Sequence, residues 1–236
     1  MTAPNLKNRL ALITGASRGI GAALAKGFAA QGAHVILLAR TVGALEELDD
    51  EISAAGGQAT LLPMDLTKLS DIDKIGPTLA ERFGALDIFI GNAALLGPLS
   101  PTHHVKPKEW DRAMKINFMA NARLVHTLDP LLRASDAGRI IFSTTSLARE
   151  PRAYWGPYAS SKAALESFAR TYALETLQTN MKINLIDPGI VDTYMLGQAF
   201  PGGYDGVVKK PEDVVEAYLE LAAPSCTTHG ELITLS

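Results

Sequence analysis

The sequence predicts one α/β domain built around a doubly wound, parallel sheet. Short apolar runs alternate with longer segments whose apolar residues recur at helical spacing, which is typical of repeated strand–helix units. No repeat or linker interrupts this alternation. The 236 residues, of which 47% are hydrophobic, suit a single compact core. We therefore expect residues 1–236 to form one domain.

The first unit shows the pattern most clearly. Leu10–Thr14 is continuously apolar and is predicted to be a buried strand. In the helix that follows, Ile20, Leu24 and Phe28 recur every four residues, and Gly32 provides a stop signal.

The remaining units follow in the same order. After the first helix we expect strands at Val35–Leu38, Thr60–Leu62, Asp87–Ile90, Arg139–Ser143, Lys182–Ile186 and Leu232–Leu235. Helices are expected from Thr41 to Gly56, and at Ser70–Phe83, Lys108–Leu128, Pro157–Leu177 and Glu212–Ala222.

Seven strands joined by long crossovers imply parallel neighbours, and right-handed crossovers place helices on both faces. This is a Rossmann-like arrangement. Ligands bind such sheets beyond the carboxyl ends of the strands, so motifs at those ends bear on function.

Composition narrows the class of partner. The 22 basic and 25 acidic residues give a net charge of −3 without a long run of either sign, so we expect neither nucleic acid nor membrane as a partner. Cys226 is the only cysteine, which excludes an internal disulfide and fits a reducing compartment. The adjacent His103 and His104 lack a third ligand, so no metal site is predicted. Without an apolar targeting segment, a cytoplasmic location is expected.

A glycine-rich turn follows the first strand, with the sequence Thr-Gly-Ala-Ser-Arg-Gly-Ile-Gly over residues 14–21. Glycines there let the backbone bend sharply and approach a pyrophosphate, which the following helix N-terminus would face. The pattern predicts a dinucleotide site. Its expected contacts are Gly15, Ser17, Arg18, Gly19, Ile20 and Gly21.

The end of the second predicted strand indicates which dinucleotide binds. A site selective for NAD needs a carboxylate there for the ribose 2′-hydroxyl, but the position holds Ala39. Arg40 follows it, and Arg18 lies in the glycine turn. Two guanidiniums that converge on a 2′-phosphate would favour NADP(H).

Tyr158 and Lys162 are four residues apart at the start of a predicted helix, so they share one face of it. An ammonium about 4 Å from the phenol, at an effective dielectric constant of about 20, favours the phenolate by roughly 4 kcal/mol. We therefore expect Lys162 to lower the pKa of Tyr158 far enough for the phenol to act as general acid and base near neutral pH.

These motifs resemble those of the short-chain dehydrogenases/reductases. The turn at residues 14–21 matches the family's TGxxxGxG pattern, and Tyr-Ala-Ser-Ser-Lys-Ala-Ala-Leu at 158–165 is similar to its YxASKAAL stretch. The resemblance runs from about Leu10 to Thr193. It implies a hydride transfer between the nicotinamide of NADP(H) and the carbonyl or alcohol carbon of a small molecule.

The resemblance also implies a catalytic tetrad. The family's serine precedes the tyrosine by thirteen residues, a position held here by Thr145, with Ser146 as the alternative. Asn117, in Lys-Ile-Asn-Phe, resembles the helix asparagine that holds a water linked to the lysine. The tetrad would then be Asn117, Thr145, Tyr158 and Lys162.

Further cofactor contacts are implied in the same way. Asp65 and its neighbour Leu66 would lie at the adenine, and Asn92-Ala93-Ala94 occupies the place of the family's Asn-Ala-Gly. The segment Pro188-Gly189-Ile190-Val191-Asp192-Thr193 resembles the family's PGxVxT, with Pro188, Gly189, Val191 and Thr193 at the cofactor. Tyr158 and Lys162 would contact it too.

The C-terminal part resembles the family less. Residues 194–210 are short, contain glycine and are moderately apolar, and we interpret them as a mobile lid over the substrate. The chain lacks the family's usual Val-Asp-Gly-Gly tail, which often helps build a tetramer interface. The resemblance still implies a homo-oligomer, either a dimer through the predicted helices at Lys108–Leu128 and Pro157–Leu177 or a tetramer.

Three functions compete. The leading hypothesis is a carbonyl reductase or alcohol dehydrogenase that uses NADP(H). The alternative is a non-catalytic NADP(H)-binding sensor or regulatory protein on the same fold. A dehydratase or epimerase is disfavoured because the short C-terminal part leaves little room for a nucleotide-sugar substrate.

Overall fold

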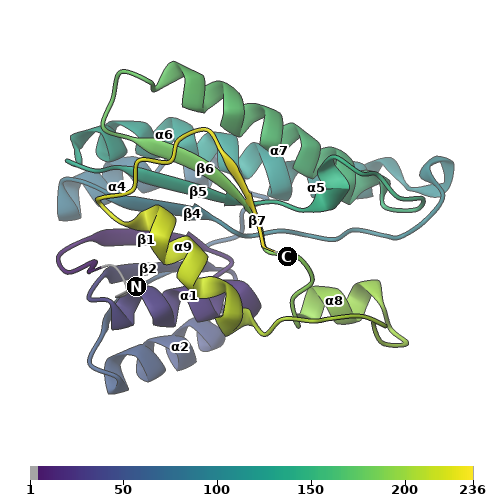
Figure 1. The fold of residues 1–236 in the computed structure, drawn as a ribbon, viewed down its shortest axis with the longest axis horizontal. Coiled ribbons are helices and arrows are strands. Elements are labelled where there is room, and N and C mark those ends of the chain that lie inside the picture. The colour runs from purple at the N-terminus through teal and green to yellow at the C-terminus, as the bar shows by residue number, and fades with distance from the viewer. Residues whose placement is uncertain (1–4, 236) are drawn as a thin grey trace.

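The computed structural model describes residues 5–235, so the outermost ends of the predicted domain lie outside the described residues. It contains one seven-stranded, all-parallel sheet in the order β3-β2-β1-β4-β5-β6-β7. Helices cover both of its faces (Figure 1). The strands are β1 Leu10–Thr14, β2 His34–Ala39, β3 Gln58–Pro63, β4 Ile88–Gly91, β5 Arg139–Ser143, β6 Lys182–Asp187 and β7 Leu232–Thr234. The predicted doubly wound single domain is confirmed.

The helices that pack on the sheet form two layers, one on each face. Helices α1 Gly19–Ala30, α2 Val42–Ala54 and α9 Val215–Ala222 pack on one face of the sheet. Helices α3 Leu69–Ile72, α4 Ile75–Phe83, α6 Ala120–Ala134 and α7 Gly156–Glu175 pack on the other. Figure 1 shows the layer with α1 and α2 below the sheet and the layer with α4, α6 and α7 above it.

Two predicted helices are interrupted in the structure. The stretch expected at Ser70–Phe83 breaks between α3 and α4 around Asp73 and Lys74. The stretch expected at Lys108–Leu128 runs instead from Pro107 to Ala134, as α5 Pro107–Met114, the π-helical segment η2 Lys115–Met119 and α6. A π turn inserts one extra residue into a helix and is often found at functional sites. Periodicity over a long window does not reveal such an insertion.

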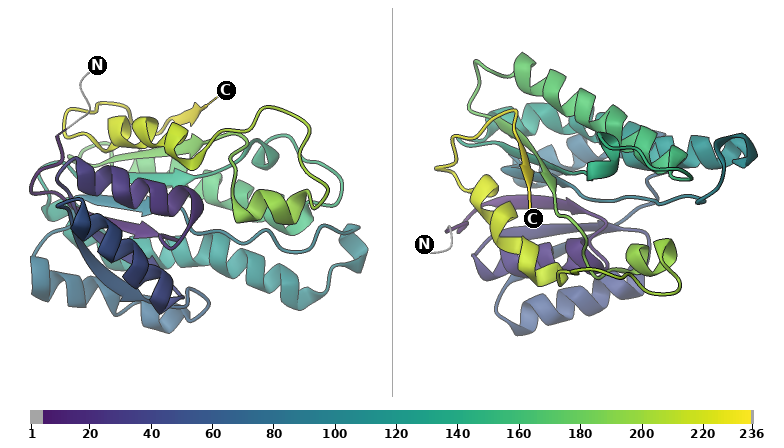
Figure 2. Two further views of the ribbon diagram at one scale, coloured as in Figure 1. Left: turned by 90° about the horizontal axis from the view of Figure 1, so that it is seen from below. Right: turned by 45° about the vertical axis from the view of Figure 1, so that its right-hand side comes forward.

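Residues 194–210 contain a short helix that the sequence analysis did not predict, α8 Tyr194–Ala199. The Thr193 hydroxyl caps it by accepting a hydrogen bond from the amide of Leu196 at 3.3 Å. The segment projects from the body of the molecule (Figure 2). At its base, Asp192 N donates to Lys209 O at 2.8 Å and Lys209 N donates to Ile190 O at 2.9 Å.

Short 3₁₀ turns complete the chain: η1 Thr102–His104, η3 Ser146–Ala148 and η4 Pro211–Val214.

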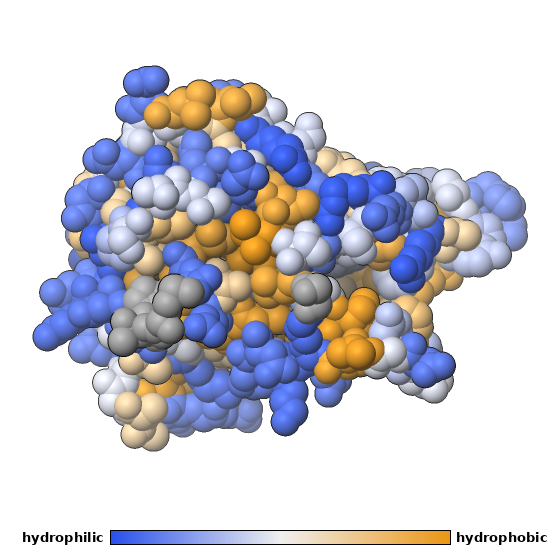
Figure 3. Space-filling view, in the orientation of Figure 1, coloured by the Kyte–Doolittle hydropathy of each residue, from blue (hydrophilic) through white to orange (hydrophobic). Residues whose placement is uncertain are grey.

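On the face shown in Figure 3, apolar side chains gather near the β7 edge of the sheet, at the C-terminal end of α7 and over α8. Leu174 and Leu177, on and just after α7, are 70% and 58% exposed. No helix within residues 5–235 combines the length and apolar character that crossing a membrane requires.

Candidate active site

The carboxyl ends of the strands border a cavity of about 500 Å³. Most of the predicted site residues line it: Gly15, Ser17, Arg18, Gly19, Ile20, Arg40, Asp65, Leu66, Asn92, Ala93, Ala94, Tyr158, Lys162, Pro188 and Thr193. Gly21, Asn117, Thr145, Gly189 and Val191 are not among its lining residues. Motifs that lie between Gly15 and Thr193 in the sequence thus meet at one site.

Hydrogen bonds from Thr14 join the ends of β1 and β4. Its hydroxyl donates to Ile90 O at 3.1 Å and accepts from the amides of Asn92 and Ala93, each at 3.0 Å. The Asn92 side-chain amide donates to Thr14 O at 3.0 Å. Thr14 is buried, so these bonds are shielded from water and hold the two strand ends in register.

The glycines of the turn are required by close packing. Gly15 has a φ of +67°, and a Cβ there would lie 2.9 Å from Ala93 Cα. A Cβ on Gly21 would lie 2.1 Å from Gly15 O, inside van der Waals contact. Gly21 therefore shapes the turn from behind without lining the cavity.

The N-terminus of α1 opens toward this turn. No side chain within the described structure caps it, and its first turn carries no acidic residue. The free amides and the positive end of the helix dipole leave a cradle that suits a pyrophosphate. The residues present therefore fit a dinucleotide.

Ala94 adopts an ordinary backbone conformation. Within residues 5–235, the non-glycine residues with positive φ are Asn8 and Tyr154. The alanine that replaces the family's glycine therefore needs no left-handed conformation.

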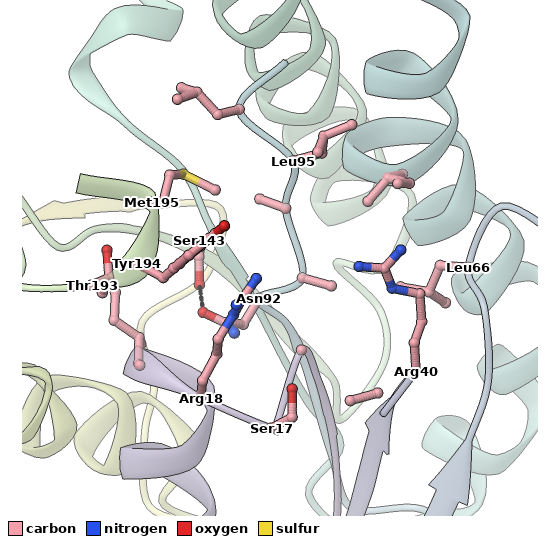
Figure 4. A pocket seen from close by; sticks show the side chains of 18 of the residues that line it. Ser17, Arg18, Arg40, Leu66, Asn92, Leu95, Ser143, Thr193, Tyr194 and Met195 are labelled. Carbon is pink, nitrogen blue, oxygen red and sulfur yellow. Dashed lines mark hydrogen bonds between the residues drawn. The ribbon is translucent and has the colours of Figure 1, made fainter. Parts of the chain in front are cut away.

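Arg18 and Arg40 both line the cavity but point to different parts of it (Figure 4). The Arg18 guanidinium lies 4.1 Å from the ring centroid of Tyr194 at the start of α8, a cation–π geometry. Arg40 lies beyond the glycine turn, where its charge contributes to the lowered pKa of Asp65, whose main cause is the hydrogen bond from the Thr67 amide. The expected convergence of the two guanidiniums is not found, because Arg18 stacks on Tyr194.

Tyr158 and Lys162 lie in the first turns of α7, both buried. Lys162 Nζ donates to Ser143 O, at the end of β5, at 2.6 Å. Burial lowers the pKa of Lys162 to about 8, and the charge of Glu166 opposes this shift. The ammonium is thus fixed to the end of β5.

Burial also decides the ionisation of Tyr158. Loss of solvent raises the pKa of this phenol, and the negative charge of Asp187 raises it further. The expectation that Lys162 lowers the pKa of Tyr158 is therefore wrong for this structure. The shift arises mainly from desolvation, which the sequence does not reveal, and the ammonium of Lys162 is bonded to Ser143 O.

Asn117 lies in the π segment η2 and is fully buried. Its side-chain oxygen accepts from Leu95 N at 2.7 Å, and its side-chain nitrogen donates to Leu95 O and to Ser161 Oγ, each at 2.9 Å. Ser161 Oγ in turn donates to Tyr158 O at 2.8 Å. Asn117 thereby connects the loop after β4 to the helix that carries Tyr158.

The hydroxyl cluster after β5 divides into three environments. Ser143 Oγ lies 2.7 Å from the hydroxyl of the buried Tyr218, and Thr144 Oγ1 donates to Glu166 at 2.7 Å. Both line the cavity. Thr145 is half-buried at the start of η3, where its hydroxyl accepts a 3.4 Å bond from Leu147 N, and Ser146 is exposed.

Several cavity residues were not singled out from the sequence. Leu95 and Leu96, Arg112 and Ile116, and Met195 and Gln198 also line it. Arg149, which belongs to none of the sequence motifs, makes two ion pairs with buried carboxylates. Ordinary residue types at irregular spacing give no motif, so only the fold brings them together.

The chain matches the family model described as short chain dehydrogenase over residues 9–202. It is 36% identical to the uncharacterized oxidoreductase YciK of Escherichia coli K12, over 92% of this chain and 86% of that protein. It is also similar to a short chain dehydrogenase from Shigella flexneri complexed with NADP (TM-score 0.93, 34% identity, 99% of each chain). A short chain dehydrogenase from Escherichia coli CFT073 complexed with NADPH gives a TM-score of 0.93 at 35% identity, with 98% of each chain covered.

Proposed function

Because the chain belongs to the short chain dehydrogenase family, we propose that it is an NADP(H)-dependent oxidoreductase that acts on a carbonyl or alcohol group of a small molecule. The observation that carries this proposal is the position of Tyr158 and Lys162, which line the same cavity as the glycine turn. A protein that only bound the dinucleotide would not need a phenol buried at that place.

The choice of NADP(H) rests on the end of β2. Ala39 offers no carboxylate to a ribose hydroxyl, and the exposed Arg40 beside it can contact a 2′-phosphate. The similar proteins from Shigella flexneri and Escherichia coli, whose structures hold NADP and NADPH, support the same choice. Asp65, Asn92 and Thr193 would contact the remainder of the cofactor.

When bound, NADPH supplies the hydride. The Tyr158 hydroxyl donates a proton to the substrate oxygen, so the carbonyl becomes an alcohol and the phenolate is left behind. The raised pKa of Tyr158 keeps its proton in place at neutral pH, which favours the role of acid in carbonyl reduction. Lys162 would stabilise the phenolate and contact the nicotinamide ribose.

A hydroxyl beside Tyr158 would orient the substrate oxygen. Thr144 already donates to Glu166, whereas within residues 5–235 the Thr145 proton has no acceptor. Thr145 lies next to the cavity-lining Thr144, and this position, thirteen residues before Tyr158, supports it as the donor to a substrate. Residues 194–210 would cover the substrate as a lid, with Met195 and Gln198 on its inner side.

The test is a screen of aldehydes and ketones in which NADPH oxidation is followed by absorbance. Replacement of Tyr158 by Phe removes one oxygen and leaves the ring to pack, so NADPH affinity should stay within about twofold. Turnover on any compound found active should fall by about 10²–10⁴, the usual contribution of a positioned general acid. Unimpaired turnover in a folded Tyr158→Phe protein would refute the assignment. NADPH binding without turnover of any compound would favour the non-catalytic sensor.

A further inference from the structure

Three charged side chains from different elements meet beside the active site. Arg149 follows η3, Glu166 lies on α7, and Asp187 ends β6. The Arg149 guanidinium forms one ion pair with Glu166, and its Nη2 lies 2.7 Å from Asp187 Oδ2. The carboxylate side chains are only 8% and 4% exposed. A single arginine thus bridges two buried acids.

The charges of both acids act on the proposed catalytic pair, Tyr158 and Lys162. Glu166 is one helical turn after Lys162, and its charge favours the protonated form of that lysine. Asp187 favours the protonated form of Tyr158. The titratable groups near this cluster are Lys162, Tyr158 and Glu166 from α7, Asp187 from β6 and Tyr218 from α9.

Neutral groups also donate hydrogen bonds to the two carboxylates. Glu166 also accepts the hydroxyl of Thr144, and Asp187 accepts the amide of Gly189 at 3.2 Å. Two buried carboxylates repel each other unless a cation lies between them. The forked guanidinium of Arg149 meets both, which a point charge could not do equally well.

We propose that Arg149 is a positioning residue of this active site, which bridges Glu166 and Asp187 and so shields Tyr158 and Lys162 from two buried negative charges. This inference rests on the proposed function. Without Arg149, the charge of Glu166 acts on Lys162 uncompensated, so the lysine keeps its proton to a higher pH. A merely structural ion pair would not change the titration of Lys162.

Binding of NADPH at different pH values tests the proposal without a substrate. The protonated Lys162 is the form that would donate to the ribose, so the dissociation constant should begin to rise near pH 8 in the wild-type protein. In Arg149→Gln the onset, which is the pH at which the dissociation constant for NADPH begins to rise, should move up by about one pH unit. Arg149→Lys, which keeps the charge but loses the fork, should give a smaller upward shift.

Two variants serve as controls. Arg152→Gln removes an exposed arginine from the same loop and should leave the onset at the wild-type value. Lys162→Met should abolish the rise of the NADPH dissociation constant with pH. Equal onsets in the wild-type, Arg149→Gln and Arg149→Lys proteins would overturn the proposal. NADPH binding and the Tyr158-dependent reaction could both persist in that case, so the proposed function would stand.

Discussion

The strand ends and the 194–210 segment border the same cavity, but different interactions hold them. At the strand ends, the buried hydroxyl of Thr14 and the buried Lys162 are fixed by hydrogen bonds of 2.6–3.1 Å to neighbouring strands. The backbone bridge between Val191 and Lys209 closes the base of the 194–210 segment, and Lys209 Nζ donates to Leu235 O at 3.0 Å.

Beyond that base, the segment holds the short helix α8 and a set of ring contacts. Phe200 packs against Trp155 and Tyr204, with ring centroids 6.1 and 4.9 Å apart. Tyr194 is 59% exposed and Val207 is 90% exposed. Half-buried ring contacts of this kind are easier to rearrange than buried hydrogen bonds. We therefore expect the strand ends to fix the proposed chemistry and the segment to adapt to the substrate.

If the strand ends fix the chemistry, removal of one hydroxyl there should have a large effect. We expect Thr145→Ala to lower kcat by about 10²–10³, the cost of one lost donor to a developing oxyanion. Ser146→Ala should change kcat less than about twofold, because Ser146 is exposed. Steady-state kinetics on an active carbonyl compound provide the comparison, and the reverse ranking would transfer the role to Ser146.

The second largest effect is expected for a substitution at the end of β2, which should change the preference for NADPH over NADH. Arg40→Asp should weaken NADPH binding by about 10–100-fold, since a charge-assisted hydrogen bond contributes about 1.5–3 kcal/mol. NADH binding should be unchanged or improved, because the new carboxylate can accept a ribose hydroxyl. Fluorescence titration with both dinucleotides measures the ratio. A preference for NADPH that survives in Arg40→Asp would exclude Arg40 as its source.

The smallest effect is expected where the segment meets the glycine turn. Tyr194→Ala removes the ring beneath Arg18, worth about 0.5–1 kcal/mol at an exposed site, so NADPH affinity should fall about two- to fivefold. Tyr194→Phe keeps an aromatic face and should behave like the wild-type protein. A loss in Tyr194→Ala as large as that in Arg40→Asp would contradict the division between the two regions.

Local signals were sufficient to predict the fold and much of the site. The spacing of glycines at residues 15–21 and of Tyr158 and Lys162 depends on one turn or one helix, which sequence periodicity describes well. Arg149, Glu166 and Asp187 come from three elements, so no spacing rule connects them. The ionisation of Tyr158 was predicted in the wrong direction because it depends on burial by distant residues. The location, the assembly and the exclusion of nucleic acid as a partner stay predictions.

The backbone pairing between Val191 and Lys209 has a consequence for engineering. Because the pairing holds Val191 and Lys209 together, the closure cost for a replacement of residues 195–208 by a stretch of different length would grow only slowly with that length. These residues can therefore be exchanged as a cassette, with Thr193 and Lys209 retained at its two ends. A library of such cassettes would vary the substrate range on an unchanged catalytic scaffold.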